Sequence, residues 1–160
     1  MNFSNCPCLR VLVVDSEPND RYLTTCHLTQ ALLNPTGLVV ECAAEGLTAL
    51  DMIRSESFVL ALLSWEMATL TGYEILNTMR REGSRVPVVI LSGHHRNEIE
   101  KDLDVLGAVF LNKNEINPDS LIRAIATATR QQEAKAEPIP FRQRVATGGN
   151  TPYSQPPFPR

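Results

Sequence analysis

Short apolar runs alternate with amphipathic segments along the first 132 residues of the chain. The runs are three to six residues long and rich in Val, Leu and Ile, which is typical of buried strands. They lie at 9–14, 38–43, 58–63, 86–91 and 109–111. Each run is followed by a segment with apolar residues at helical spacing, so five strands are predicted to alternate with five helices.

The predicted helices have recognisable ends. Pro18 suits the first turn of the first helix, because a missing N–H costs nothing there. Thr71-Gly72 opens the third helix, and Asn117-Pro118 caps the last one. The fourth helix, over 99–106, is amphipathic and ends at Gly107.

This pattern indicates an α/β fold. Strands that are apolar throughout need cover on both faces, so the sheet is expected to be parallel with helices on either side. Crossovers between parallel strands are right-handed. The pattern therefore predicts a doubly wound three-layer sandwich of about 130 residues.

The periodicity fades after residue 132 and divides the chain into three parts. Residues 1–7 form an N-terminal extension, residues 8–132 the domain, and residues 133–160 a tail that holds six of the 11 prolines. The tail cannot bury enough apolar surface to fold alone, so we expect it to be disordered. Its segment 156–159 (PPFP) is either a docking motif of polyproline type or simply part of an unstructured end.

Charge and hydropathy exclude some partners. Residues 1–137 hold 18 acidic and 12 basic residues, a net charge of −6, whereas residues 138–160 carry +3. An acidic domain lacks the basic face that nucleic-acid binding needs. No apolar run approaches membrane-spanning length, and the N-terminus lacks a secretory signal. We therefore expect no nucleic acid, no membrane and a cytoplasmic location.

Cysteine and histidine do not indicate a metal site. Cys26 and Cys42 lie inside apolar elements and are expected to be small core residues. The adjacent His94 and His95 do not point at one centre easily, and no third ligand is evident. A solvated loop is the simpler interpretation of this histidine pair.

Polar side chains follow four of the strands at the point where each strand ends. They are Asp15, Ser16 and Glu17 after the first strand, Ser64 after the third, Ser92 after the fourth and Lys113 after the fifth. In a doubly wound sheet the ligand site lies at the carboxyl ends of the strands. Acids, hydroxyls and a lysine are therefore predicted to converge there.

Four motifs resemble the receiver domains of bacterial response regulators, of the chemotaxis-regulator kind. The motifs are 11–18 (VLVVDSEP), 63–74 (LSWEMATLTGYE), 88–93 (VVILSG) and 110–113 (FLNK). The resemblance covers about residues 8–132. It implies a flavodoxin-like (βα)5 fold with a five-stranded parallel sheet in the order 2-1-3-4-5. It also implies a role in two-component or phosphorelay signal transduction.

The resemblance also assigns roles to residues. In working receivers an aspartate after the third strand accepts a phosphoryl group, while Mg²⁺ is held partly by acids after the first strand. A lysine and a Ser/Thr hydroxyl hold the phosphoryl oxygens, and the hydroxyl and an aromatic report the event to the surface. Here Lys113, Ser92 and the switch aromatic Phe110 match these positions, and Asp15 retains one acid.

Two departures compromise the pocket. The acceptor position is Ser64, and a neutral hydroxyl is a poor nucleophile without a base. Ser16 replaces the second acid, which leaves few carboxylates for Mg²⁺. We therefore expect a degenerate pseudo-receiver with no catalytic residue, no cofactor and weak or absent Mg²⁺ binding. Our hypothesis is that a Lys113–Asp15 pair, with hydrogen bonds to Ser64 or Ser92, fills the pocket.

The leading prediction is a stand-alone signalling module that is not an enzyme and acts by protein–protein contact without phosphorylation. Its partners would be a histidine kinase, a downstream effector or a second copy in a homodimer. The expected surface is formed by helix 99–106, strand 109–111 and the last helix. No room is left for a DNA-binding output domain after residue 132.

Two alternatives stay open. The first is a receiver phosphorylated on another residue, such as Asp15 or Glu66. The second is a flavodoxin-like enzyme or flavin binder, because a fold does not determine a function. Against the second, the sequence has no P-loop, no G-x-G-x-x-G after the first strand and no nucleophile elbow.

Overall fold

The computed structural model describes residues 8–33, 37–94 and 100–135. Within these ranges the strands are β1 (Leu9–Val14), β2 (Leu38–Ala43), β3 (Leu60–Ser64), β4 (Val88–Ser92) and β5 (Ala108–Asn112). The α-helices are α1 (Pro18–Ala31), α2 (Gly46–Ser55), α3 (Gly72–Arg81), α4 (Glu100–Leu106) and α5 (Pro118–Lys135). A short 3-10 turn, Lys113–Glu115, joins β5 to α5.

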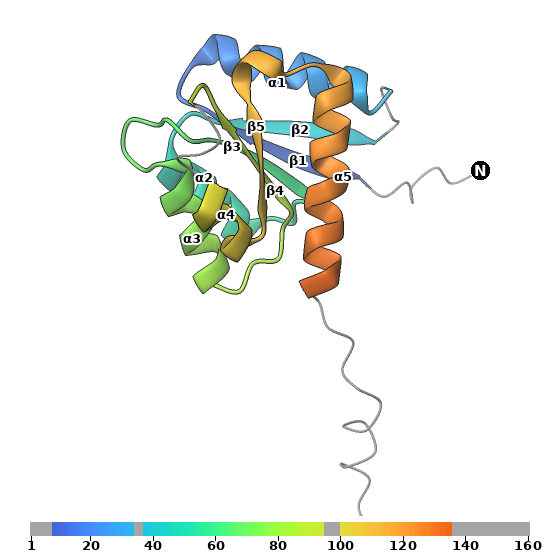
Figure 1. The fold of residues 1–160 in the computed structure, drawn as a ribbon. Coiled ribbons are helices and arrows are strands. Elements are labelled where there is room, and N and C mark those ends of the chain that lie inside the picture. The colour runs from blue at the N-terminus through green and yellow to red at the C-terminus, as the bar shows by residue number, and fades with distance from the viewer. Residues whose placement is uncertain (1–7, 34–36, 95–99, 136–160) are drawn as a thin grey trace, which may run out of the picture.

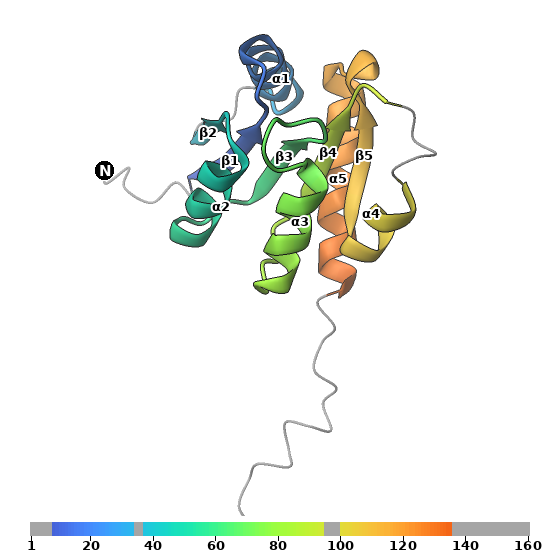
Figure 2. The ribbon, with the colours of Figure 1, turned by 90° about the vertical axis from the view of Figure 1, so that its left-hand side faces the viewer.

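The strands form one parallel sheet in the order β2-β1-β3-β4-β5. Helices α1 and α5 cover one face of the sheet, and α2, α3 and α4 cover the other (Figure 1 and Figure 2). The predicted flavodoxin-like doubly wound sandwich, including its strand order, is therefore confirmed.

The core has two halves because side chains alternate along each strand. Leu12 of β1 belongs to the half beneath α2, α3 and α4, whereas its neighbour Val13 belongs to the half beneath α1 and α5. The central strands β3 and β4 are buried at every residue. Their last residues, Ser64 and Ser92, therefore place buried hydroxyls at the edge of the apolar core.

Three predicted helix ends are confirmed. The Thr71 hydroxyl accepts the Glu74 N–H at 3.2 Å and the Glu74 carboxylate accepts the Thr71 N–H at 2.8 Å, which forms a capping box. Asn117 accepts the Ser120 N–H through its side-chain oxygen at 2.9 Å. Gly107 follows α4 with a φ of 67°, the left-handed conformation that glycine adopts without strain.

Strands β3 and β4 each start two residues later and end one residue later than predicted. Phe58 packs in the core instead of extending β3, with the Arg10 guanidinium 5.3 Å from its ring centre. Pro87 precedes β4 because proline has no N–H to donate to the ladder. The shift brings Ser64 and Ser92 into the strands themselves.

The cysteine prediction is wrong. Cys42 is exposed and Cys26 is only half-buried, although both lie in regular elements. The reason for Cys42 is the position of β2 at the edge of the sheet, where few of its side chains are fully covered. An apolar sequence run does not by itself distinguish an edge strand from a central one.

Helix α5 continues to Lys135, so residues 133–135, the first of the predicted tail, are helical. Gln132 anchors this end: its side chain is buried and donates to the Gly107 carbonyl at 2.8 Å. Residues 1–7 and 136–160 lie outside the described residues. The N-terminal extension and the Pro-rich tail with its 156–159 motif therefore stay predictions.

Gly72→Ala should destabilise the domain by about 2 kcal/mol, as overpacking of a tight contact does. A methyl group at Gly72 would lie 2.4 Å from the Ser64 carbonyl oxygen, which is backbone and cannot move cheaply. Urea unfolding measures the loss. Gly93→Ala is the control, because the space around Gly93 is open. Equal unfolding midpoints for the two variants would contradict this account of the β3–α3 contact.

Candidate functional site

The carboxyl ends of the strands surround a cavity of about 520 Å³. The loops after β1, β3 and β5 supply most of its walls, as expected for the ligand-binding edge of such a sheet. Its lining includes Asp15, Ser16, Glu17, Trp65, Glu66 and Lys113. The other two predicted site residues, Ser64 and Ser92, do not line the cavity and are fully buried.

Lys113 binds two carboxylates. Its Nζ lies 2.7 Å from Asp15 Oδ2 and 2.8 Å from Asp20 Oδ2. Asp15 is only 2% exposed, and its other oxygen accepts the Glu17 N–H at 2.9 Å. The predicted Lys113–Asp15 pair is therefore confirmed, and Glu17 contributes its backbone, with an exposed side chain.

Asp20 is a site residue that the sequence analysis missed. It lies in the first turn of α1, which starts at Pro18, directly after the β1 loop. The available signal was its position, because the first turn of a helix that follows a strand lies at the same edge of the sheet as the strand end. An acid there can reach the same lysine as Asp15 does.

Burial lowers the pKa of Lys113, but hydrogen bonds and charge attraction from Asp15 and Asp20 outweigh it, so the pKa of Lys113 is raised above its ordinary value. Lys113 is therefore a cation throughout the physiological range. The stabilisation linked to this shift is fully present below the ordinary lysine pKa of about 10.4. It is lost only as the pH rises above that value through the raised pKa.

Glu66 binds both buried serines. Ser92 donates its hydroxyl to the Glu66 carboxylate, and Ser64 donates to the Glu66 backbone carbonyl at 3.2 Å. The Ser92 oxygen in turn accepts the His94 N–H at 3.1 Å. The serines thus bond to Glu66 and not to the Lys113–Asp15 pair, so that part of our hypothesis is wrong.

The structure also places His94, Trp65 and Phe110. His94 is exposed, with Nε2 3.5 Å from Glu66 Oε1, and His95 lies outside the described residues. Trp65 packs partly buried against the core, with its ring centre 6.0 Å from that of Tyr73. Phe110 is partly buried in β5 and packs against the core half beneath α2, α3 and α4.

The donors at this site do not fit Mg²⁺. This ion prefers several hard oxygen ligands with free carboxylates among them. Both Asp15 oxygens already accept hydrogen bonds, and Ser16 offers a hydroxyl in place of a second acid. Among the described residues, no group of three His, Cys, Asp or Glu side chains is placed to hold a metal ion.

Comparison with known proteins identifies the family. The model of the response regulator receiver domain matches residues 11–126, most of the chain. The chain belongs to this receiver-domain family. Response regulators act in two-component signalling, where they interact with histidine kinases and effectors.

Solved receiver structures share the fold. A CheY-like receiver domain protein from Methanospirillum hungatei superimposes with a TM-score of 0.66 at 25% identity, covering 80% of this chain and 98% of its own. The receiver domain of Francisella response regulator 1452 gives 0.62 at 25% identity, covering 77% and 98%. The match spans nearly the whole of each solved receiver.

Curated relatives are longer proteins. The transcriptional regulatory protein FixJ of Bradyrhizobium diazoefficiens is 29% identical over 115 residues, which are 72% of this chain and 56% of FixJ. TctD of Salmonella typhimurium is 32% identical over 66 residues, 41% of this chain and 30% of TctD. The chain thus spans about half or less of the length of these relatives.

No helix in the described part of the chain is long and apolar enough to cross a membrane.

Proposed function

We propose that this receiver domain is a pseudo-receiver, which works in signal transduction without aspartyl phosphorylation. One observation carries the proposal: the groups that would hold a phosphoryl group are already bonded to residues of the same chain. Lys113 is held by Asp15 and Asp20, and Ser92 by Glu66. An incoming phosphoryl group would have to displace these carboxylates.

The acceptor position supports the same proposal. Ser64 has no exposed surface, and its hydroxyl donates to the Glu66 carbonyl. A serine needs a base to become a nucleophile, and its hydrogen-bond partner is a carbonyl, which cannot take a proton. We infer that the domain is not an enzyme, catalyses no transfer to itself, and binds Mg²⁺ weakly or not at all.

Without a phosphoryl switch, the domain offers one surface to its partners. We infer that it acts by protein–protein contact through the α4–β5–α5 face, either with a kinase or effector or with a second copy. We infer no contact with nucleic acid or membrane, in keeping with the net charge of −6 over residues 1–137. Phe110 lies on this face in β5, so its packing helps to shape the contact surface.

Incubation of the full chain with acetyl phosphate and Mg²⁺, followed by intact mass measurement, tests the proposal. We expect no gain in mass, because acceptor, metal ligands and phosphoryl-binding groups are all compromised. A stoichiometric gain of one phosphoryl group would overturn it. Asp15→Asn and Glu66→Gln variants would then show whether either of these carboxylates is the acceptor.

A further inference from the structure

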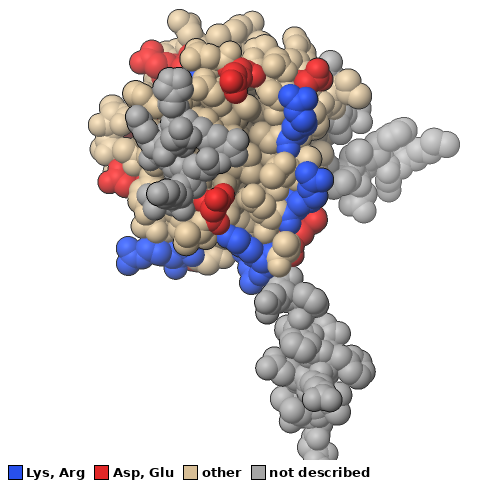
Figure 3. Space-filling view, in the orientation of Figure 1, with Lys and Arg blue, Asp and Glu red and all other residues tan. Residues whose placement is uncertain are grey.

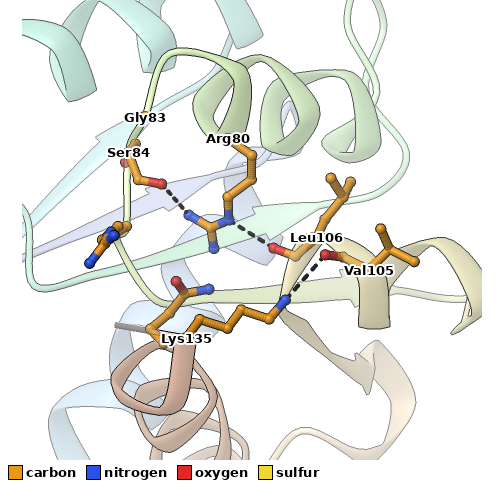
Figure 4. A pocket seen from close by; sticks show the side chains of 8 residues that line it. Arg80, Gly83, Ser84, Val105, Leu106 and Lys135 are labelled. Carbon is orange, nitrogen blue, oxygen red and sulfur yellow. Dashed lines mark hydrogen bonds between the residues drawn. The ribbon is translucent and has the colours of Figure 1, made fainter. Parts of the chain in front are cut away.

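A second cavity lies at the opposite end of the sheet, where α3, α4 and α5 end (Figure 4). Its volume is about 250 Å³. The loop after α3, around Gly83 and Ser84, forms one wall, and the ends of α4 and α5 form the others. None of the residues of the degenerate phosphorylation pocket takes part in it, so this groove is a separate feature of the domain.

Three cations line this groove: Arg80, Arg85 and Lys135. No acidic side chain is part of its lining. In a domain whose residues 1–137 have a net charge of −6, this is an unusual concentration of positive charge. Figure 3 shows Lys and Arg side chains along α5 and across the lower end of the domain, with Asp and Glu side chains beside some of them.

The two inner cations bond to neutral groups. Arg80 donates to the carbonyls of Leu106 at 2.8 Å and Ser84 at 3.0 Å, and Lys135 donates to the Val105 carbonyl at 3.1 Å (Figure 4). Burial lowers the pKa of Arg80, but a guanidinium stays charged in proteins. Carbonyls at helix ends offset only part of a full charge. The groove therefore keeps a net positive charge.

Arg85 is the cation that is free to meet a ligand. It is exposed, and within the described residues its side chain makes no hydrogen bond or ion pair. Asp104 contributes its backbone carbonyl to Lys135 at 3.3 Å and is not part of the lining. An incoming carboxylate would meet Arg85 without competing with a carboxylate that lines the groove.

An apolar surface adjoins the cations. Val105 is 78% exposed at the end of α4, and Leu106 beside it is half-buried. The volume lies below the range of about 300–1,000 Å³ that is typical of small-molecule sites. It is large enough for one or two side chains. Positive charge beside an exposed aliphatic side chain suits a peptide that carries an acid next to an apolar residue.

We propose that this groove binds an acidic segment of a protein partner. A carboxylate of the partner pairs with Arg85, and a neighbouring apolar side chain packs on Val105. A peptide fits better than nucleic acid, because three cations in one groove fall short of the extended basic face that nucleic-acid binding uses. The proposal goes beyond the pseudo-receiver function, and either can fail without the other.

Fluorescence anisotropy of the full chain with a fluorescein-labelled peptide of alternating Asp and Leu tests this. We expect saturable binding that weakens with added NaCl and falls at least about tenfold in Arg85→Glu. Val105→Ser should weaken binding less. Arg123→Glu is the matched control, because it makes the same charge reversal on α5, about 18 Å from Lys135 along the helix. Its affinity should equal that of the unchanged protein.

Three outcomes would overturn the proposal. The first is equal affinity for a peptide with Asn in place of Asp. The second is a loss of affinity in Arg123→Glu as large as that in Arg85→Glu. The third is an unchanged affinity in Arg85→Glu. Anionic phospholipid vesicles and sedimentation velocity are run alongside. Vesicle binding that Arg85→Glu abolishes while the peptide does not bind would assign the groove to lipid headgroups. A dimer that Arg85→Glu dissociates would assign it to a second copy of this chain.

Discussion

Lys113→Met is expected to destabilise the domain by about 3 kcal/mol, the cost of leaving a buried charge without its partner. Asp15 is 2% exposed, and Lys113 supplies the only ion pair of its carboxylate among the described residues. Methionine keeps the volume of the lysine stem but removes the charge. Urea unfolding at pH 7 measures the change, with circular dichroism to confirm that the variant is folded.

Two further variants separate charge from packing. Asp15→Asn combined with Lys113→Met should recover at least half of the loss, because no unpaired buried charge remains. Asp20→Asn alone should cost less than about 1 kcal/mol, since its carboxylate is more exposed. Its side chain is 37% exposed, against 3% for Asp15. A Lys113→Met loss below that of Asp20→Asn would show that the pair contributes little to stability.

Ser64→Asp together with Ser16→Asp is expected to accept a phosphoryl group from acetyl phosphate with Mg²⁺, whereas Ser64→Asp alone stays unmodified. The single change supplies a nucleophile but leaves the metal one carboxylate short. Addition of Glu66→Ala to the double variant should raise the rate at least about tenfold. The Glu66 carboxylate otherwise holds the Ser92 hydroxyl and repels the incoming anion.

Intact mass against time measures all three variants, and thermal melts with and without Mg²⁺ show that each is folded. The melts are necessary because Ser64 is fully buried and an added carboxylate there needs the metal to offset its charge. Efficient modification of Ser64→Asp alone would mean that Ser16 matters little for metal binding. An unchanged rate on addition of Glu66→Ala would mean that Glu66 does not compete for Ser92.

The fold could be predicted because its signals are periodic and local. Runs such as 9–14 and 86–91 have no polar face, which requires helices on both sides of the sheet. Caps such as Thr71 and Gly107 have sequence signatures that depend only on neighbouring residues. Strand boundaries could not be predicted to the residue, because Phe58 continues an apolar run without pairing in the sheet.

The site was predicted only where strand ends determine it. Asp15 and Lys113 follow two strands directly, so parallel topology alone brings them together. The sequence indicates Glu66 only as an alternative acceptor, because its contact with Ser92 depends on the path of the β3–α3 loop. The loop has no periodic pattern, and its fold is set by tertiary contacts. The binding partner of each buried hydroxyl therefore required the structure.

Trp65 is the only tryptophan of the chain. It lines the cavity and packs beside Tyr73, so its indole is partly shielded and partly in contact with the cavity. Tryptophan fluorescence of the protein therefore originates from this one residue beside the cavity. Changes in Trp65 fluorescence can follow titrations of the pocket with candidate ions or partners, without an added label.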